Sequence, residues 1–174
     1  MSGINRKKEH LYIFPEDNAY KDMVQCFENE CTQIQCLKPF RGYIGKLKDK
    51  IERKIELPRL NEYSFILILI DYDNKATNYN KEYTIEQKID LINQIKTLLQ
   101  GKVKQENIFI MGIEFKESEN LKKFFNTTFE KIGQILFNDL KDNKIDNWNN
   151  KHLQRNINEL EKMRKAGICS FLGI

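Results

Sequence analysis

The chain has 174 residues, of which 40% are hydrophobic and 31% are charged. This length suits about one domain, and the composition is typical of a folded globular protein, which excludes disordered, collagenous and membrane-spanning chains. A formal net charge of +4 permits binding to nucleic acid but does not demonstrate it.

The first half of the chain alternates predicted strands with predicted helices. A short buried strand is expected over 10–14, and apolar residues at helical spacing predict a helix over 17–29. A second strand over 34–37 precedes a strongly basic helix over 43–55 that has one apolar face. The segment 64–70 is apolar at every position, which indicates a strand that is covered on both faces of its sheet.

The second half continues this alternation. Thr84 and Gln87 match the capping box that begins a helix, and Gly101 is suited to end that helix. The remaining predicted elements are a buried strand over 107–113 and helices over 118–142 and 149–165. The sequence therefore predicts an α/β fold, with a mainly parallel four-stranded sheet, helices on both faces and extra C-terminal helices.

Residues 9–174 are expected to form a single domain, with a core over 9–115, a helical extension over 116–174 and a basic tail over 1–8. No apolar run is long enough to cross a bilayer, so we expect a cytoplasmic protein without a membrane partner. The cysteines show none of the spacings of zinc sites and are expected to be ordinary reduced thiols. They are Cys26, Cys31, Cys36 and Cys169.

Acidic residues follow the predicted strands at their carboxyl ends, which is where sites form in open parallel sheets. Glu16 and Asp17 follow the first strand, Asp71 and Asp73 follow the third, and Glu114 follows the fourth. Crowded carboxylates raise one another's pKa, whereas Mg²⁺ or Mn²⁺ accepts oxygen ligands and keeps them ionised. The conjunction predicts a divalent-metal site, although helix capping or a turn is the alternative explanation for each acid taken singly.

A first strand that ends in glutamate (LYIFPED), a second strand–helix unit and a third strand that ends in Asp-x-Asp (FILILIDYD) resemble the Toprim domain. This domain occurs in topoisomerases, primases and small or overcoming-lysogenization-defect nucleases, and the likeness spans about residues 9–115. The resemblance implies that Glu16, Asp71 and Asp73 bind Mg²⁺ for phosphodiester chemistry, and Glu114 looks like an additional metal-binding acid. It also implies a small nuclease or nuclease subunit, of a kind that often occurs in antiviral systems with an ATPase partner.

Under this interpretation the metal ions bind the scissile phosphate of DNA or RNA and activate water, and Glu16 could act as general base. Lys116 is expected to stabilise charge on the phosphate. Other basic side chains are expected to contact the nucleic-acid backbone, and two of them, His152 and Arg155, would share one side of a predicted helix. The predicted nucleic-acid-binding residues are Arg41, Lys46, Lys50, Lys75, His152 and Arg155. A solvated surface is the alternative explanation for each.

Two other functions stay open. Acids after the first strand and Asp71 after the third also resemble the phosphoacceptor pocket of a receiver domain. A receiver, however, has Ser or Thr after the fourth strand, where this chain has Glu114, and Lys after a fifth strand. The other alternative is a non-catalytic interaction domain that keeps the α/β scaffold.

Overall fold

The computed structural model describes residues 9–41, 44–54, 58–72, 84–114 and 118–168. Within these ranges the chain forms four strands and six α-helices. The strands are β1 (His10–Pro15), β2 (Ile34–Cys36), β3 (Ser64–Asp71) and β4 (Ile108–Ile113). The helices are α1 (Asn18–Glu30), α2 (Ile44–Glu52), α3 (Ile85–Leu99), α4 (Ser118–Phe125), α5 (Phe129–Lys141) and α6 (Ile157–Lys165), with short 3₁₀ turns at Gln105–Asn107 and Gln154–Asn156. The predictions for Asp73, Lys75, Lys116, Cys169 and the tail 1–8 lie outside the described residues.

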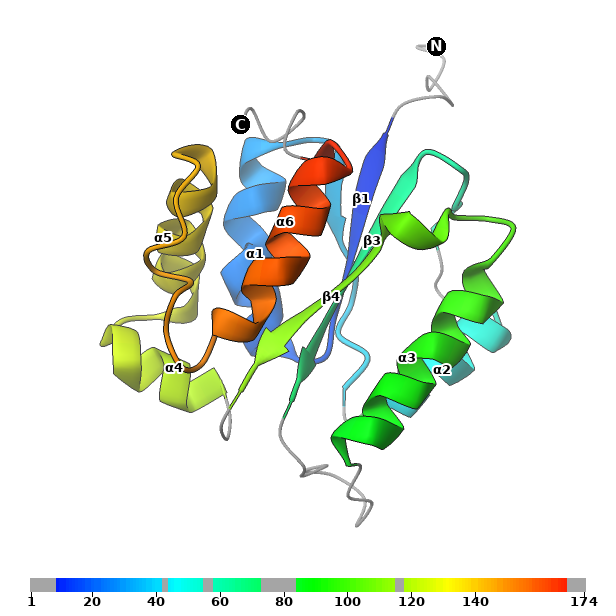
Figure 1. Ribbon diagram of the computed structural model, residues 1–174, viewed down its shortest axis with the longest axis horizontal. Coiled ribbons are helices and arrows are strands. Elements are labelled where there is room, and N and C mark those ends of the chain that lie inside the picture. The colour runs from blue at the N-terminus through cyan, green and yellow to red at the C-terminus, as the bar shows by residue number, and fades with distance from the viewer. Residues whose placement is uncertain (1–8, 42–43, 55–57, 73–83, 115–117, 169–174) are drawn as a thin grey trace.

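The four strands form one parallel sheet in the order β2-β1-β3-β4. Helices α1, α5 and α6 cover one face of this sheet, and α2 and α3 cover the other (Figure 1). The predicted α/β fold is therefore confirmed. Because β2 and β3 lie on opposite sides of β1, the direction of strand addition reverses between β1 and β3.

The core lies in two layers, one on each face of the sheet, because successive side chains of a strand point to opposite faces. In β3, Leu67 and Leu69 pack under α1 and α5, whereas Ile66 and Ile68 pack under α2 and α3. All of these side chains are buried, as predicted for a strand that is covered twice. Burial of each stabilises the fold by about 1.5–3 kcal/mol.

Local signals position α3 as predicted. The Thr84 hydroxyl accepts from the Gln87 backbone N–H at 3.2 Å, and the Gln87 side chain accepts from the Thr84 N–H at 3.0 Å. Gly101 follows the helix with φ +86°, a left-handed conformation that glycine adopts without steric cost. None of the helices in the described part of the chain is long and apolar enough to span a membrane.

The predicted helix over 118–142 is wrong in one respect, because the chain breaks it into α4 and α5. Asn126 adopts a left-handed conformation with φ +49°, which asparagine tolerates better than most residues. Thr128 then caps α5, since its hydroxyl accepts from the Lys131 N–H at 3.5 Å. The long apolar stripe was thus shared by two shorter helices.

The predicted helix over 149–165 is also too long, because α6 begins only at Ile157. The preceding residues instead follow the free edge of β4. Glu114 N–H donates to the His152 carbonyl at 3.0 Å, and Asn156 bonds both the N–H and the C=O of Gly112, at 2.9 and 2.8 Å. These bonds replace a neighbouring strand and protect the edge from pairing with another chain.

The same contacts bear on the receiver interpretation, which requires a fifth strand. Farther along the β4 edge, the Ile110 N–H donates to the Glu159 carboxylate at 3.0 Å. Side chains from α6 and the turn before it therefore occupy the position of a fifth strand. Among the described residues, β4 pairs only with β3.

Candidate functional site

Glu16 follows β1 and Asp71 ends β3, the two strands between which the strand order reverses. Connections from such a pair of strands diverge to opposite sides, which opens a crevice at the carboxyl ends where α/β proteins bind ligands. Backbone pairing continues up to this point, because the Glu16 N–H donates to the Leu69 carbonyl at 2.9 Å. The fold therefore brings the first and third acidic segments side by side.

The two acidic residues are in direct contact. Glu16 Oε2 accepts from the Asp71 backbone N–H at 2.7 Å, across 55 residues of sequence. Burial, and then the negative charge of Asp71, raise the pKa of Glu16 to about 8. The hydrogen bond from Asp71 and the charge of Lys88 act in the opposite direction but do not compensate.

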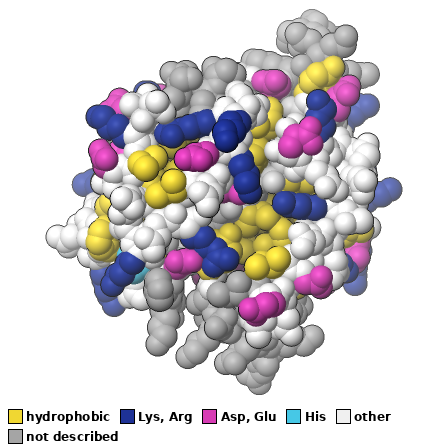
Figure 2. Space-filling model, viewed as in Figure 1, with side chains coloured by type: hydrophobic (Ala, Val, Ile, Leu, Met, Phe, Trp, Pro, Cys, Tyr) yellow, Lys and Arg dark blue, Asp and Glu magenta, His cyan; other side chains and the backbone are white. Residues whose placement is uncertain are grey.

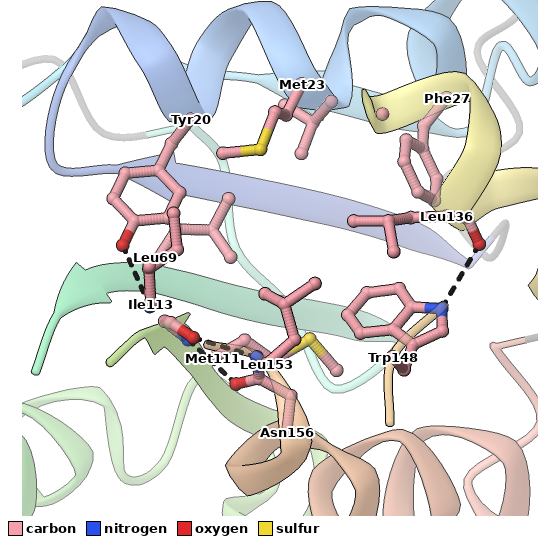
Figure 3. Close-up of a pocket in the computed structure, with 13 residues that line it drawn as sticks. Tyr20, Met23, Phe27, Leu69, Met111, Ile113, Leu136, Trp148, Leu153 and Asn156 are labelled. Atoms are coloured by element: carbon pink, nitrogen blue, oxygen red, sulfur yellow. Dashed lines mark hydrogen bonds between the residues drawn. The ribbon is translucent and has the colours of Figure 1, made fainter. Parts of the chain in front are cut away.

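Tyr20 of α1 holds the Asp71 carboxylate from the other side. Its hydroxyl lies 2.7 Å from Asp71 Oδ1 and 2.8 Å from the Ile70 carbonyl, and it accepts from the Ile113 N–H at 3.1 Å. The Tyr20 side chain lines an apolar cavity of about 60 Å³ between the helices and the sheet (Figure 3). A buried hydroxyl needs hydrogen-bond partners, and because the cavity is apolar these partners come from the strand ends. Burial and the charge of Asp71 raise the pKa of Tyr20, which keeps the hydroxyl protonated.

Lys88 brings a positive charge to the same place. It lies in the first turns of α3, is only 7% exposed, and donates from Nζ to the Asp71 carbonyl at 2.6 Å. A buried ammonium requires hydrogen bonds and nearby negative charge, and the pair of carboxylates supplies that charge. The result is a cluster of two acids, one lysine and one tyrosine at the sheet end.

The loop between β2 and α2 forms another wall of the site. Phe40 N–H donates to the Pro15 carbonyl at 3.1 Å, and Arg41 N–H donates to the Glu16 carbonyl at 2.8 Å. Arg41 is exposed and therefore lies at the rim beside Glu16. The predicted basic residues Lys46 and Lys50 follow on α2, where both are half-buried.

Asp17 caps a helix, which was the alternative explanation given for the acids that follow the first strand. Its carboxylate accepts from the Tyr20 backbone N–H at 3.1 Å and caps α1. This cap fixes the start of the helix that carries the Tyr20 side chain. Asp17 thus acts on the site by positioning Tyr20.

The structure gives Glu114 a different partner from the one predicted. Glu114 pairs with Arg155 at 3.2 Å, and the Arg155 guanidinium lies 4.3 Å from the centre of the Tyr72 ring. Tyr72 packs with the core under α2 and α3, whereas Asp71 points toward α1. Glu114 and Asp71 therefore leave the sheet toward opposite faces.

His152 is a correction, because the sequence places it with Arg155 on one side of an exposed helix. Its side chain is only 4% exposed and lies in the turn before α6. Its ring contacts Phe124 edge-on at 5.6 Å, and Nδ1 lies 3.3 Å from the Glu114 carbonyl. These contacts give His152 a packing role, whereas Arg155 remains at the surface.

The described residues thus contribute two of the predicted metal-binding side chains, Glu16 and Asp71, to one place. No group of three or more His, Cys, Asp or Glu side chains that could hold a metal lies within the ranges that the structure describes. The predicted third ligand, Asp73, and the predicted phosphate-binding Lys116 are outside those ranges. No protein-family model matches the chain, and neither a curated protein nor a solved structure is significantly similar to it. The Toprim resemblance therefore stays a prediction.

Sequence reasoning missed Tyr20 and Lys88. Tyr20 was part of the apolar stripe of its helix, and the available signal was its hydroxyl, which needs a partner once it is buried. Lys88 lies one turn after the N-cap residue Thr84, so its proximity to the crevice was implicit in the predicted helix start. The strand order determines which carboxylate lies near the Tyr20 hydroxyl and which lies near the Lys88 ammonium.

Proposed function

We propose that this protein is a divalent-metal-dependent nuclease, or the nuclease subunit of a complex, that cleaves phosphodiester bonds in nucleic acid. The observation that carries the proposal is the contact between Glu16 and Asp71 at the point where the strand order reverses. Carboxylates from two separate segments at this crevice are the arrangement that a shared Mg²⁺ or Mn²⁺ requires.

The donor set fits a hard divalent cation. The ligand atoms are carboxylate oxygens, which Mg²⁺ and Mn²⁺ prefer to the nitrogen and sulfur ligands of zinc. Burial and the charge of Asp71 raise the pKa of Glu16 in spite of the nearby Lys88 ammonium, and a bound cation would favour the ionised form of the carboxylate. Glu16 and Asp71 would hold the ion, and the resemblance adds Asp73 as a further ligand.

The surrounding residues supply positioning and charge. A bound divalent ion polarises the phosphate and lowers the pKa of water. The Tyr20 hydroxyl and the Lys88 ammonium hold Asp71 through its carboxylate and its carbonyl, so that its orientation does not depend on the ligand. Arg41, whose backbone bonds the Glu16 carbonyl at the rim, would contact a substrate phosphate, and Glu16 would accept a proton from the attacking water.

The wider setting follows the same proposal. An ATPase partner and a role in antiviral defence come from the Toprim resemblance alone. For location we propose the cytoplasm, because Cys26 and Cys36 are free thiols, as expected in a reducing compartment. Burial raises the pKa of Cys26 to about 11 and that of Cys36 to about 12, which makes both poor metal ligands and nucleophiles.

The test is cleavage by the purified protein of single-stranded DNA, duplex DNA and transfer RNA, with Mg²⁺ or Mn²⁺ and with EDTA. We expect metal-dependent cleavage that Asp71→Asn and Glu16→Gln abolish and that Glu161→Gln, an exposed control on α6, retains. Metal should also raise the melting temperature of the wild type. Cleavage that survives in both site variants contradicts the proposal. If the protein shows neither cleavage nor stabilisation by metal, the result favours an interaction domain. Labelling of Asp71 by acetyl phosphate favours a receiver.

A further inference from the structure

A groove runs between α3 and α6 over the edge of the sheet and encloses about 320 Å³. Figure 2 shows apolar surface between these two helices with basic side chains around it. The residues that give the groove its chemistry are Tyr72, Ile89, Lys96, Arg155, Glu159 and Lys162. Its volume is at the lower end of the range for small-molecule sites, which suits a single nucleotide unit and is too small for a duplex.

Tyr72 and Arg155 form the end of the groove nearest the Glu16–Asp71 site. Gly112 lies beneath Tyr72, because a Cβ atom there would approach the ring to 2.9 Å and overlap the Ile70 carbonyl. The Arg155 guanidinium lies 4.3 Å from the ring centre, and Glu114 holds it at 3.2 Å. A guanidinium that is held between a ring and a carboxylate in this way offers a planar group on which a base can stack.

The groove carries excess positive charge. Lys96, Arg155 and Lys162 are opposed within the lining by Glu159 alone. Glu159 is already engaged, because one of its oxygens accepts from the Ile110 N–H at 3.0 Å and the other pairs with Lys162 at 2.9 Å. Arg155 is engaged by Glu114, so the three basic side chains and these two acids leave a net charge of +1, carried by Lys96, which favours an anionic ligand.

The apolar part of the groove indicates which class of anionic ligand fits it. Ile89 is 42% exposed, which is unusual for isoleucine, and it adjoins the buried Ile92. Ile89 and Lys96 are two turns apart on α3, or about 10 Å along the helix axis. A ligand with planar apolar groups and regularly spaced negative charges matches this lining, and single-stranded nucleic acid has both.

We propose that this groove binds a single strand of nucleic acid as it leaves the Glu16–Asp71 site. Phosphates contact Lys96 and Lys162, and a base lies against the plane of Arg155. The path is supported through α3, because Ile89 of the groove follows Lys88, whose ammonium donates to the Asp71 carbonyl. The inference rests on the proposed nuclease function for its substrate class, but the binding it describes is measurable without cleavage.

The experiment measures fluorescence anisotropy of a labelled 12-nucleotide single strand in EDTA, where no metal-dependent cleavage occurs. The test variant is Lys96→Gln/Lys162→Gln. The matched control is Lys104→Gln/Lys131→Gln, which removes the same charge from exposed positions outside the groove. We expect the test variant to lose about tenfold in affinity at 0.1 M salt, and its slope of log K against log salt to fall by about 1.4. The control should lose less than twofold.

Equal losses of affinity in the test and control variants would refute the groove proposal. Binding of a 12-base-pair duplex or of an acidic peptide as tightly as the single strand would also refute it. Circular dichroism establishes that each variant is folded. Failure of the two proposals is distinguishable. If the wild type never cleaves nucleic acid but the groove variant binds the single strand more weakly, the nuclease proposal is refuted and the groove proposal is supported. If the wild type cleaves nucleic acid and the groove variant binds the single strand as tightly as the wild type, the groove proposal is refuted and the nuclease proposal is supported.

Discussion

Replacing Glu16 by glutamine isolates the electrostatic cost of the acidic pair. Glutamine keeps an oxygen that can accept from the Asp71 N–H, but it removes the titrating carboxylate. Burial and the charge of Asp71 raise the pKa of Glu16 from 4.5 to about 8. Between these two values the folded protein holds a proton that the unfolded chain has released. The free energy of unfolding should therefore fall as the pH rises from about 4.5 to about 8.

The size of this effect follows from the pKa difference. The interval from 4.5 to about 8 corresponds to an upper limit of about 5 kcal/mol, at about 1.4 kcal/mol for each pH unit. For a chain of this length, that limit corresponds to about 10–20 °C in melting temperature. The Glu16→Gln variant lacks this loss, so its stability relative to the wild type should rise steadily across the window and level off above pH 8.

The assay is urea unfolding in EDTA at pH values from 4 to 9, followed by the fluorescence of Trp148, which is buried and is the single tryptophan of the chain. Glu161→Gln is the control, because it removes one carboxylate from an exposed position. A difference between the wild type and Glu16→Gln that does not change with pH would refute the reasoning. Added Mg²⁺ should reduce the difference at pH 8, since the ion offsets the repulsion between the carboxylates only in the wild type.

Two further substitutions test the packing that positions the site. Tyr20→Phe leaves the buried Ile113 N–H without its acceptor and should lower the free energy of unfolding by about 1–3 kcal/mol in urea titrations, and an unchanged midpoint would contradict the role of the hydroxyl. Gly112→Ala forces a Cβ against the Ile70 carbonyl and the Tyr72 ring, so we expect a loss of about 3 kcal/mol or more. A Gly112→Ala protein with wild-type stability would show that the ring is not seated on the strand as described.

Part of this protein was predictable because it depends on short-range patterns. The unbroken apolar run of β3 requires cover on both faces, and the hydroxyl and amide of Thr84 and Gln87 lie within one helical turn of the groups they bond. The acids at strand ends were also visible, since a parallel sheet places all carboxyl ends at one rim. Each of these features is settled by neighbours in the sequence or by the direction of the strands.

The tertiary structure alone decided which of these acids meet. Glu16 contacts Asp71 because β1 and β3 are adjacent, whereas Glu114 leaves β4 toward the other face and pairs with Arg155. The roles of Tyr20 and of the segment before α6 likewise follow from polar groups that have no local partner once they are buried. Such groups are satisfied by whatever the fold brings near them, across 50 residues in the case of Tyr20 and Ile70, and no local pattern specifies that encounter.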